Sequence, residues 1–77
     1  MPLFWIAKTI DGERRYFIQE ADWPIFAMLR AAIAGFSGQP EETIELDAKT
    51  ARKVPKKMIG RVLSQSEAEA LLARFGA

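Results

Sequence analysis

The 77-residue chain contains no cysteine and no histidine. Disulfide bonds are therefore excluded, and a metal site would lack the thiolate and imidazole ligands that soft metals prefer. The same absence removes the commonest general base and the most nucleophilic side chain from any catalytic site. Ser37, Ser64 and Ser66 have no base near them in the sequence. We therefore expect a protein that is not an enzyme and that binds no cofactor and no metal.

A glycine-rich phosphate-binding loop is also missing. The segment GFSG at residues 35–38 lacks both the lysine of a P-loop and the spacing of a dinucleotide-binding motif. Glu45 and Asp47 would share one face of a strand and, with Glu41 or Glu42, could hold a hard cation weakly. We interpret these acids as a solvated strand face.

Long hydrophobic runs are missing as well. The longest nearly apolar stretch, residues 25–36, is interrupted by Arg30 and is shorter than the roughly 20 apolar residues that cross a bilayer. The opening MPLFWIAK has no basic region and no small-residue cleavage site after it. We expect a cytoplasmic protein with no membrane span.

What is present indicates one small folded domain over residues 1–77. A hydrophobic content of 49% is incompatible with wholesale disorder. A domain of this size buries only about 60% of the surface of its unfolded chain, so its stability is modest. Without disulfides or a metal, self-association remains as the means of adding stability.

The segment LFWIAKTIDGERRYFIQE predicts a β-hairpin, because two aromatic and β-branched runs flank Asp11-Gly12, a pair that accepts the positive φ angles of a tight turn. Two registers are open. A two-residue turn places Trp5 opposite Ile18, whereas a three-residue bulged loop places Trp5 opposite Phe17.

A helix is predicted over residues 23–34. Asp22 would cap it, Pro24 would lie in its first turn, and Gly35 or Gly38 would end it. Ile25, Leu29, Ala32 and Phe36 form one apolar stripe, and Phe26 and Ile33 add a second.

This helix is apolar almost all round, since Arg30 is the only charge between Pro24 and Phe36. Such helices are normally buried, and the rest of a small chain can hardly cover every side of one. We therefore expect a homodimer that forms through this helix and one face of the hairpin. The expected interface residues are Trp23, Phe26, Arg30 and Ile33.

The remaining chain predicts a short strand, TIELD, with Ile44 and Leu46 facing inward, then a short helix over residues 48–54 capped by Asp47. A C-terminal helix follows the capping box of Ser64 and Glu67. Its apolar stripe is Ala68, Leu71, Leu72 and Phe75. The fold class is therefore α+β: an N-terminal β-hairpin, a hydrophobic helix, a short third strand, a basic connecting segment and a C-terminal helix.

The basic connecting segment is KTARKVPKKMIGR, residues 49–61, which contains no acid. Residues 1–48 carry four bases and eight acids, whereas residues 49–77 carry seven bases and two acids. Pro55 interrupts helical geometry, so residues 55–63 could form a helix, a turn or a strand. The candidate residues for binding nucleic acid or another anion are Lys49, Arg52, Lys53, Lys56, Lys57 and Arg61.

TARKVPKKMIGRVL is similar in texture to the two helices of a bacterial helix-turn-helix, although Gly60 would fall inside the second helix. This resemblance implies contact with duplex DNA. No aromatic residue alternates with the bases, so the stacking surface of a single-strand binder is missing. We expect a non-catalytic, dimeric interaction module. The alternatives are a nucleic-acid-binding protein and a protein whose basic segment contacts an acidic protein surface.

Overall fold

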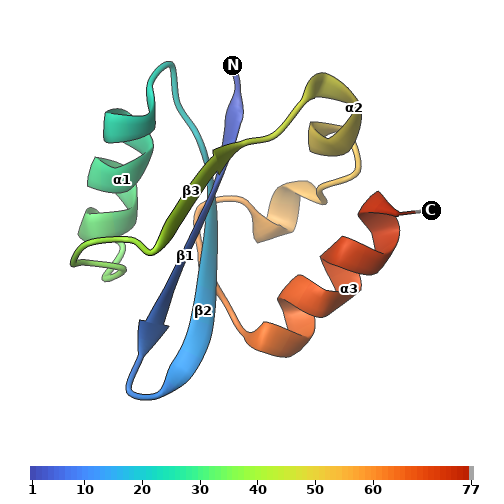
Figure 1. Ribbon diagram of the computed structural model, residues 1–77. Coiled ribbons are helices and arrows are strands. Elements are labelled where there is room, and N and C mark those ends of the chain that lie inside the picture. Colours follow the sequence, from blue (N-terminus) through green and yellow to red (C-terminus); the bar gives the residue numbers. More distant parts are fainter. Residues whose placement is uncertain (77) are drawn as a thin grey trace.

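A β-hairpin forms the centre of the molecule. Residues 1–76 are described by a computed structural model, in which strand β1 (Leu3–Ile10) pairs antiparallel with β2 (Glu13–Glu20). Strand β3 (Glu42–Glu45) lies outside β1 and β4 (Val62–Leu63) lies outside β2, which gives the order β3-β1-β2-β4 (Figure 1). The predicted α+β class and order of elements are confirmed.

The hairpin has the two-residue turn. Asp11 (φ 52°) and Gly12 (φ 79°) both occupy the left-handed region, as a tight hairpin turn requires. Trp5 therefore pairs with Ile18. The same register places Lys8 opposite Arg15, but each base binds elsewhere: Lys8 donates to the carbonyl of Ser37 and Arg15 forms an ion pair with Glu13.

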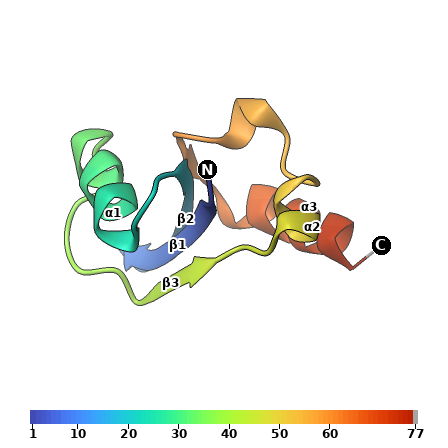
Figure 2. The same ribbon diagram turned by 90° about the horizontal axis from the view of Figure 1, so that it is seen from above.

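Helices cover both faces of the sheet. Helix α1 (Pro24–Ile33) lies on one face over Phe4, Ile6 and Phe17. Helices α2 (Ala48–Ala51) and α3 (Gln65–Phe75) lie on the opposite side of the sheet (Figure 2).

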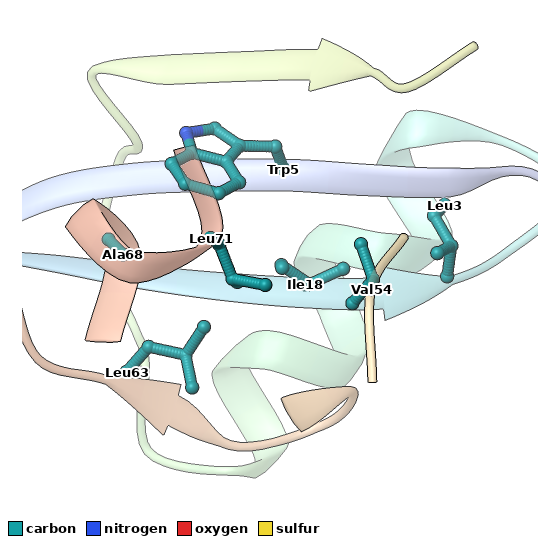
Figure 3. Packing of buried hydrophobic residues seen from close by; sticks show 7 residues of the cluster. All are labelled: Leu3, Trp5, Ile18, Val54, Leu63, Ala68 and Leu71. Atoms are coloured by element: carbon teal, nitrogen blue, oxygen red, sulfur yellow. The ribbon is translucent and has the colours of Figure 1, made fainter. Parts of the chain in front are cut away.

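The core on the α3 side contains the alternate strand residues, with Leu3, Trp5 and Ile18 packed against Leu63 and Leu71 (Figure 3). Helices of the chain itself cover the apolar side chains on both faces of the hairpin. The expected contribution of one hairpin face to a dimer therefore gains no support from the packing and stays a prediction.

Helix α1 begins and ends on local signals. Trp23 is its N-cap and Pro24 its first residue, so the predicted side-chain cap at Asp22 is wrong: the extended backbone of Trp23 starts the helix without a side-chain hydrogen bond. At the other end Gly35 has φ 97°, and the N–H of Phe36 donates to the carbonyl of Ala31 at 2.7 Å. This is a Schellman motif, in which the buried Phe36 follows the left-handed glycine.

The basic segment is mostly irregular. Asp47 caps α2 as predicted, accepting from Thr50 N–H at 2.7 Å, but α2 is only four residues long. Beyond Pro55 the chain forms a short 3-10 turn, η1 (Lys56–Met58), and the N–H of Gly60 then donates to the carbonyl of Ile18 at 2.7 Å. Since β4 follows directly, no second helix exists, and the similarity to a helix-turn-helix does not extend to the structure.

Helix α3 has the predicted capping box. The hydroxyl of Ser64 accepts from the N–H of Glu67 at 3.3 Å, and the carboxylate of Glu67 accepts from the N–H of Ser64 at 3.1 Å. Leu71 is buried and packs in the core cluster that contains Ile18 of β2, whereas Leu72 is 52% exposed. The predicted apolar stripe of α3 is therefore buried at Leu71 but not at Leu72.

We predict unequal losses for Leu71→Ala and Leu72→Ala. Leu71→Ala removes a fully buried side chain and should lower the free energy of unfolding by about 2–5 kcal/mol. Leu72→Ala, on the same turn of the helix, should cost less than about 1 kcal/mol because it opens no core cavity. Urea titrations followed by circular dichroism measure both. Equal losses would contradict the packing of α3.

Candidate functional site

The outer side of α1 exposes large apolar side chains. Five of the nine exposed large hydrophobic residues within residues 1–76 lie on α1 or at its N-cap, with exposed fractions from 46% at Phe26 to 87% at Ile33. The outer α1 surface, as we call it, consists of Trp23, Ile25, Phe26, Leu29 and Ile33.

The packing of α1 explains this exposure. Ala27 and Ala31, one helical turn apart, are the buried residues of the helix and lie against the sheet. Small side chains let the helix backbone approach the strands closely, so the large side chains on its other sides remain in solvent. The predicted interface residues Trp23, Phe26 and Ile33 are therefore exposed together. The interface predicted from the sequence did not include Ile25 and Leu29. The signal that could have found them is the pair Ala27 and Ala31, because two small residues four positions apart mark the face of the helix that lies against the sheet.

Arg30 does not place a charge in the middle of this surface. Its Nη1 donates to the backbone carbonyl of Glu20 at 2.6 Å, which turns the guanidinium toward the end of β2. No other charged residue occurs within α1. Arg30 itself is exposed, so it is the one charged residue of α1 that a partner covering the outer α1 surface could meet.

The size of this surface can be compared with known interfaces. If a large side chain offers roughly 150–250 Å², five that are about half exposed or more contribute on the order of 500 Å². Monomers rarely expose contiguous apolar patches larger than about 300–600 Å². A stable interface buries about 800 Å² on each partner, so this surface could supply the apolar centre of one.

The six candidate bases of the basic segment divide into two groups. Arg61 donates to Glu67 at 2.5 Å and to the carbonyl of Lys57, and Lys53 donates to the carbonyl of Phe75 at 3.1 Å. These two side chains hold the segment to α3. The other four side chains are exposed and form no ion pair with any of residues 1–76: Lys49, Arg52, Lys56 and Lys57.

Three of the four acidic residues that could hold a cation have a structural partner. Glu41 accepts from the N–H of Thr9 and pairs with Arg14 at 3.1 Å, Glu42 accepts from the indole of Trp5, and Asp47 caps α2. Among residues 1–76 no three acidic side chains form a group that could hold a metal ion. In the same part of the chain no helix is long and apolar enough to span a bilayer.

Three carboxyl groups have lowered pKa values. The hydrogen bond from Arg61 and that from the backbone of Ser64 lower the pKa of Glu67. The backbone hydrogen bond of Thr9 lowers the pKa of Glu41, and that of Thr50 lowers the pKa of Asp47. In each case a donor stabilises the charged form of the carboxylate.

Comparisons with known proteins give no relative: no protein-family model, no curated protein and no solved structure matches the chain.

The lowered pKa of Glu67 predicts an acid-sensitive contact. A carboxyl group with a lower pKa in the folded state contributes stability above its ordinary pKa of 4.5, and this is lost as pH falls through the folded-state value. Glu67→Gln keeps a capping-box side chain but carries no charge at any pH. The variant should therefore lose less stability than the wild type between neutral pH and pH below 4.5.

Glu69→Gln is the matched control on the same helix. Its carboxylate accepts from Gln65 at 3.3 Å and forms no ion pair within residues 1–76. Thermal melts of the three proteins across this pH range measure the difference. Equal acid sensitivity of Glu67→Gln and the wild type would contradict the role of the Arg61–Glu67 contact.

Proposed function

We propose that the protein is a non-catalytic interaction module that forms a homodimer through the outer α1 surface. The observation that carries the proposal is the exposure of Trp23, Ile25, Phe26, Leu29 and Ile33 along one helix whose only charged residue is Arg30. Burying them would remove apolar area from water at roughly 25 cal/mol per Å², the main favourable contribution to association.

The small amount of charge on α1 favours a second copy of the chain as the partner. In a two-fold interface a surface patch meets the same patch of the other subunit. A charged patch would then face like charge at its centre, whereas an apolar patch is complementary to itself. Arg30 donates to the carbonyl of Glu20, which directs its guanidinium toward the end of β2.

We predict that Leu29→Lys abolishes the dimer. Leu29 lies near the middle of the outer α1 surface and is exposed in the single chain, so the substitution should leave the fold intact. An ammonium group in the centre of an apolar interface should weaken association by at least roughly a hundredfold, the equivalent of about 2.8 kcal/mol. Sedimentation equilibrium at micromolar concentration should give the dimer mass for the wild type and the monomer mass for Leu29→Lys.

Ala73→Lys is the matched control. Ala73 is an exposed position of α3 on the opposite side of the sheet, and the substitution adds the same charge to a helix. This variant should remain dimeric. A monomer mass for the wild type at every concentration would refute the proposal, and so would equal weakening by the two lysine substitutions.

Binding to nucleic acid through the basic segment is a second candidate function. The supporting observation is that Lys49, Arg52, Lys56 and Lys57 are exposed without an ion pair in residues 1–76. Lys and Arg side chains that neutralise phosphates release counterions, which makes binding strongly salt-dependent. The proposed dimer would carry two such segments.

The salt dependence of duplex DNA binding tests this candidate. Four phosphate contacts should give a slope of about −3.6 when the logarithm of the binding constant is plotted against the logarithm of the salt concentration. The double change Lys56→Ala, Lys57→Ala should reduce the magnitude of this slope by about 1.8. Thermal stability should hardly change, since exposed charges contribute little to folding. Fluorescence anisotropy at several salt concentrations provides both slopes. Absence of binding at low salt, or an unchanged slope in the double variant, would exclude this function.

A further inference from the structure

Strand β3 forms one edge of the sheet, and no strand among residues 1–76 pairs with its outer side (Figure 2). The strand at the other edge, β4, is only two residues long. An edge strand presents backbone N–H and C=O groups that can pair with another chain. Which of these groups β3 presents follows from its register with β1.

Two residues of β3 direct their backbone groups outward. The N–H of Leu46 donates to the carbonyl of Leu3 at 2.9 Å, and these residues continue the register of β3 with β1. Hydrogen-bonded and non-hydrogen-bonded pairs alternate along an antiparallel ladder. Ile44 therefore also bonds to β1, whereas Thr43 and Glu45 turn their N–H and C=O groups away from it. The outer edge of β3 thus offers two donors and two acceptors to a further strand.

The two faces of the sheet differ in character beside this edge. On the α3 face a pocket of about 410 Å³ opens between β3 and the C-terminal half of α3. Ile44 and Leu72 line this pocket and are 47% and 52% exposed. On the α1 face lie the exposed side chains of Thr43 and Glu45. An added strand would therefore place alternate side chains beside aliphatic and beside polar neighbours.

The pocket supplies an aliphatic rim rather than an open aromatic face. The ring of Trp5 is 5% exposed and packs against Tyr16 and Phe75, with ring centroids 5.0 Å and 6.2 Å away. Residues directly opposite each other on neighbouring strands have Cβ atoms about 4.5–5.5 Å apart. A branched aliphatic side chain opposite Ile44 would therefore lie at this rim, on the side of the sheet where Leu72 is exposed.

The charge around β3 determines which kind of strand fits its edge. Residues 41–47 contain four acids and no base. Within residues 1–76, Glu42 and Glu45 form no ion pair. A second copy of β3 would bring acids beside acids, which is unfavourable across a strand pair, whereas a lysine or arginine beside Glu45 is favourable.

We propose that the outer edge of β3 binds an extended basic segment of another protein as an additional antiparallel strand. The aliphatic side chains of this segment lie on the α3 face beside Ile44 and Leu72, and its lysine or arginine side chains lie on the α1 face beside Thr43 and Glu45. Strand addition takes affinity from main-chain hydrogen bonds and specificity from alternate side chains. The inference goes beyond the proposed dimer, because it uses a sheet edge and not the outer α1 surface.

A capped heptapeptide in which lysine alternates with valine tests the proposal. Titrated into isotope-labelled protein and followed by NMR, it should shift the amide signals of Thr43 and Glu45 saturably and slow the hydrogen exchange of both. The amide of Ile44, which bonds to β1, is the internal control and should be protected without peptide. The peptide with glutamate in place of lysine should bind at least roughly tenfold more weakly.

Methylation of the peptide backbone tests the pairing itself. In an antiparallel pair the residues that bond to Thr43 and Glu45 lie directly opposite them and point to the same face, so they are the lysines. N-methylation of the lysines should therefore abolish binding. N-methylation of the valines, whose N–H groups point to solvent, should change the affinity by less than about threefold. Equal effects of the two methylations, or the reverse order, would overturn the proposal.

Matched charge reversals in the protein locate the site. Glu45→Lys should weaken binding of the lysine peptide roughly fivefold and strengthen binding of the glutamate peptide. Glu20→Lys changes the net charge equally, but Glu20 lies on β2, which β1 separates from β3. This control should change the affinity for either peptide much less than Glu45→Lys does.

Three further outcomes would contradict strand addition at β3: no saturable shifts, equal affinity for the lysine and glutamate peptides, or equal effects of Glu45→Lys and Glu20→Lys. Protection of the Thr43 and Glu45 amides that rises with protein concentration in the absence of peptide would also contradict it, since a second copy would then occupy the edge. Leu29→Lys should leave peptide binding unchanged, so failure of the dimer and failure of this site are distinguishable.

Discussion

The central constraint on this fold is a hairpin with apolar side chains on both faces. Phe4, Ile6 and Phe17 point to one side, and Leu3, Trp5 and Ile18 point to the other. An antiparallel sheet commonly leaves one face in water, but this hairpin requires two covering layers. In a chain of 77 residues, α1 supplies one layer and residues 46–76 supply the other. Among residues 1–76 no further element covers the outside of α1, and this leaves its large apolar side chains exposed.

The way α1 meets the sheet determines which of its residues reach solvent. Ala27 and Ala31 form the contact, and Phe36 fills the space at the end of the helix after the Schellman turn. If large side chains faced the sheet, the helix would stand further away and the alanines would face water. The observed arrangement leaves the large side chains on the outer surface, where a monomer gains nothing from them. This distribution supports self-association more directly than hydrophobic content alone.

Local signals made much of the fold predictable. Asp11-Gly12 predicted the turn, and Ser64 with Glu67 predicted the start of α3, because each depends on residues close together in the sequence. The hairpin register was not predictable in this way. The like-charged pair Lys8 and Arg15 argued against the true register, and the contact of Lys8 with Ser37 that accommodates it spans much of the chain.

The outer α1 surface and the pocket also differed in how much of each could be predicted from the sequence. Part of the outer α1 surface followed from the near absence of charge in one helix, although Ile25 and Leu29 were assigned to the other stripe. The pocket was not predictable, since its aromatic and acidic residues come from four separate elements, β1, β2, β3 and α3. Periodicity within one segment gives no information about such an arrangement.

The layered architecture places the outer α1 surface on one side of the sheet and the pocket and the basic segment on the other. Helix α1 lies on one side of the sheet, and α2, η1 and α3 lie on the other in both views (Figures 1 and 2). In the proposed dimer the outer α1 surfaces would meet at the two-fold axis, and the two pockets and two basic segments would remain on the outside. Since Lys53 and Arg61 tie the basic segment to α3, and Leu72 and Phe75 of α3 line the pocket, α3 is the element that joins these two outer surfaces. Its capping box and the buried Leu71 thus support the fold and, with it, the position of the α3 side chains Leu72 and Phe75.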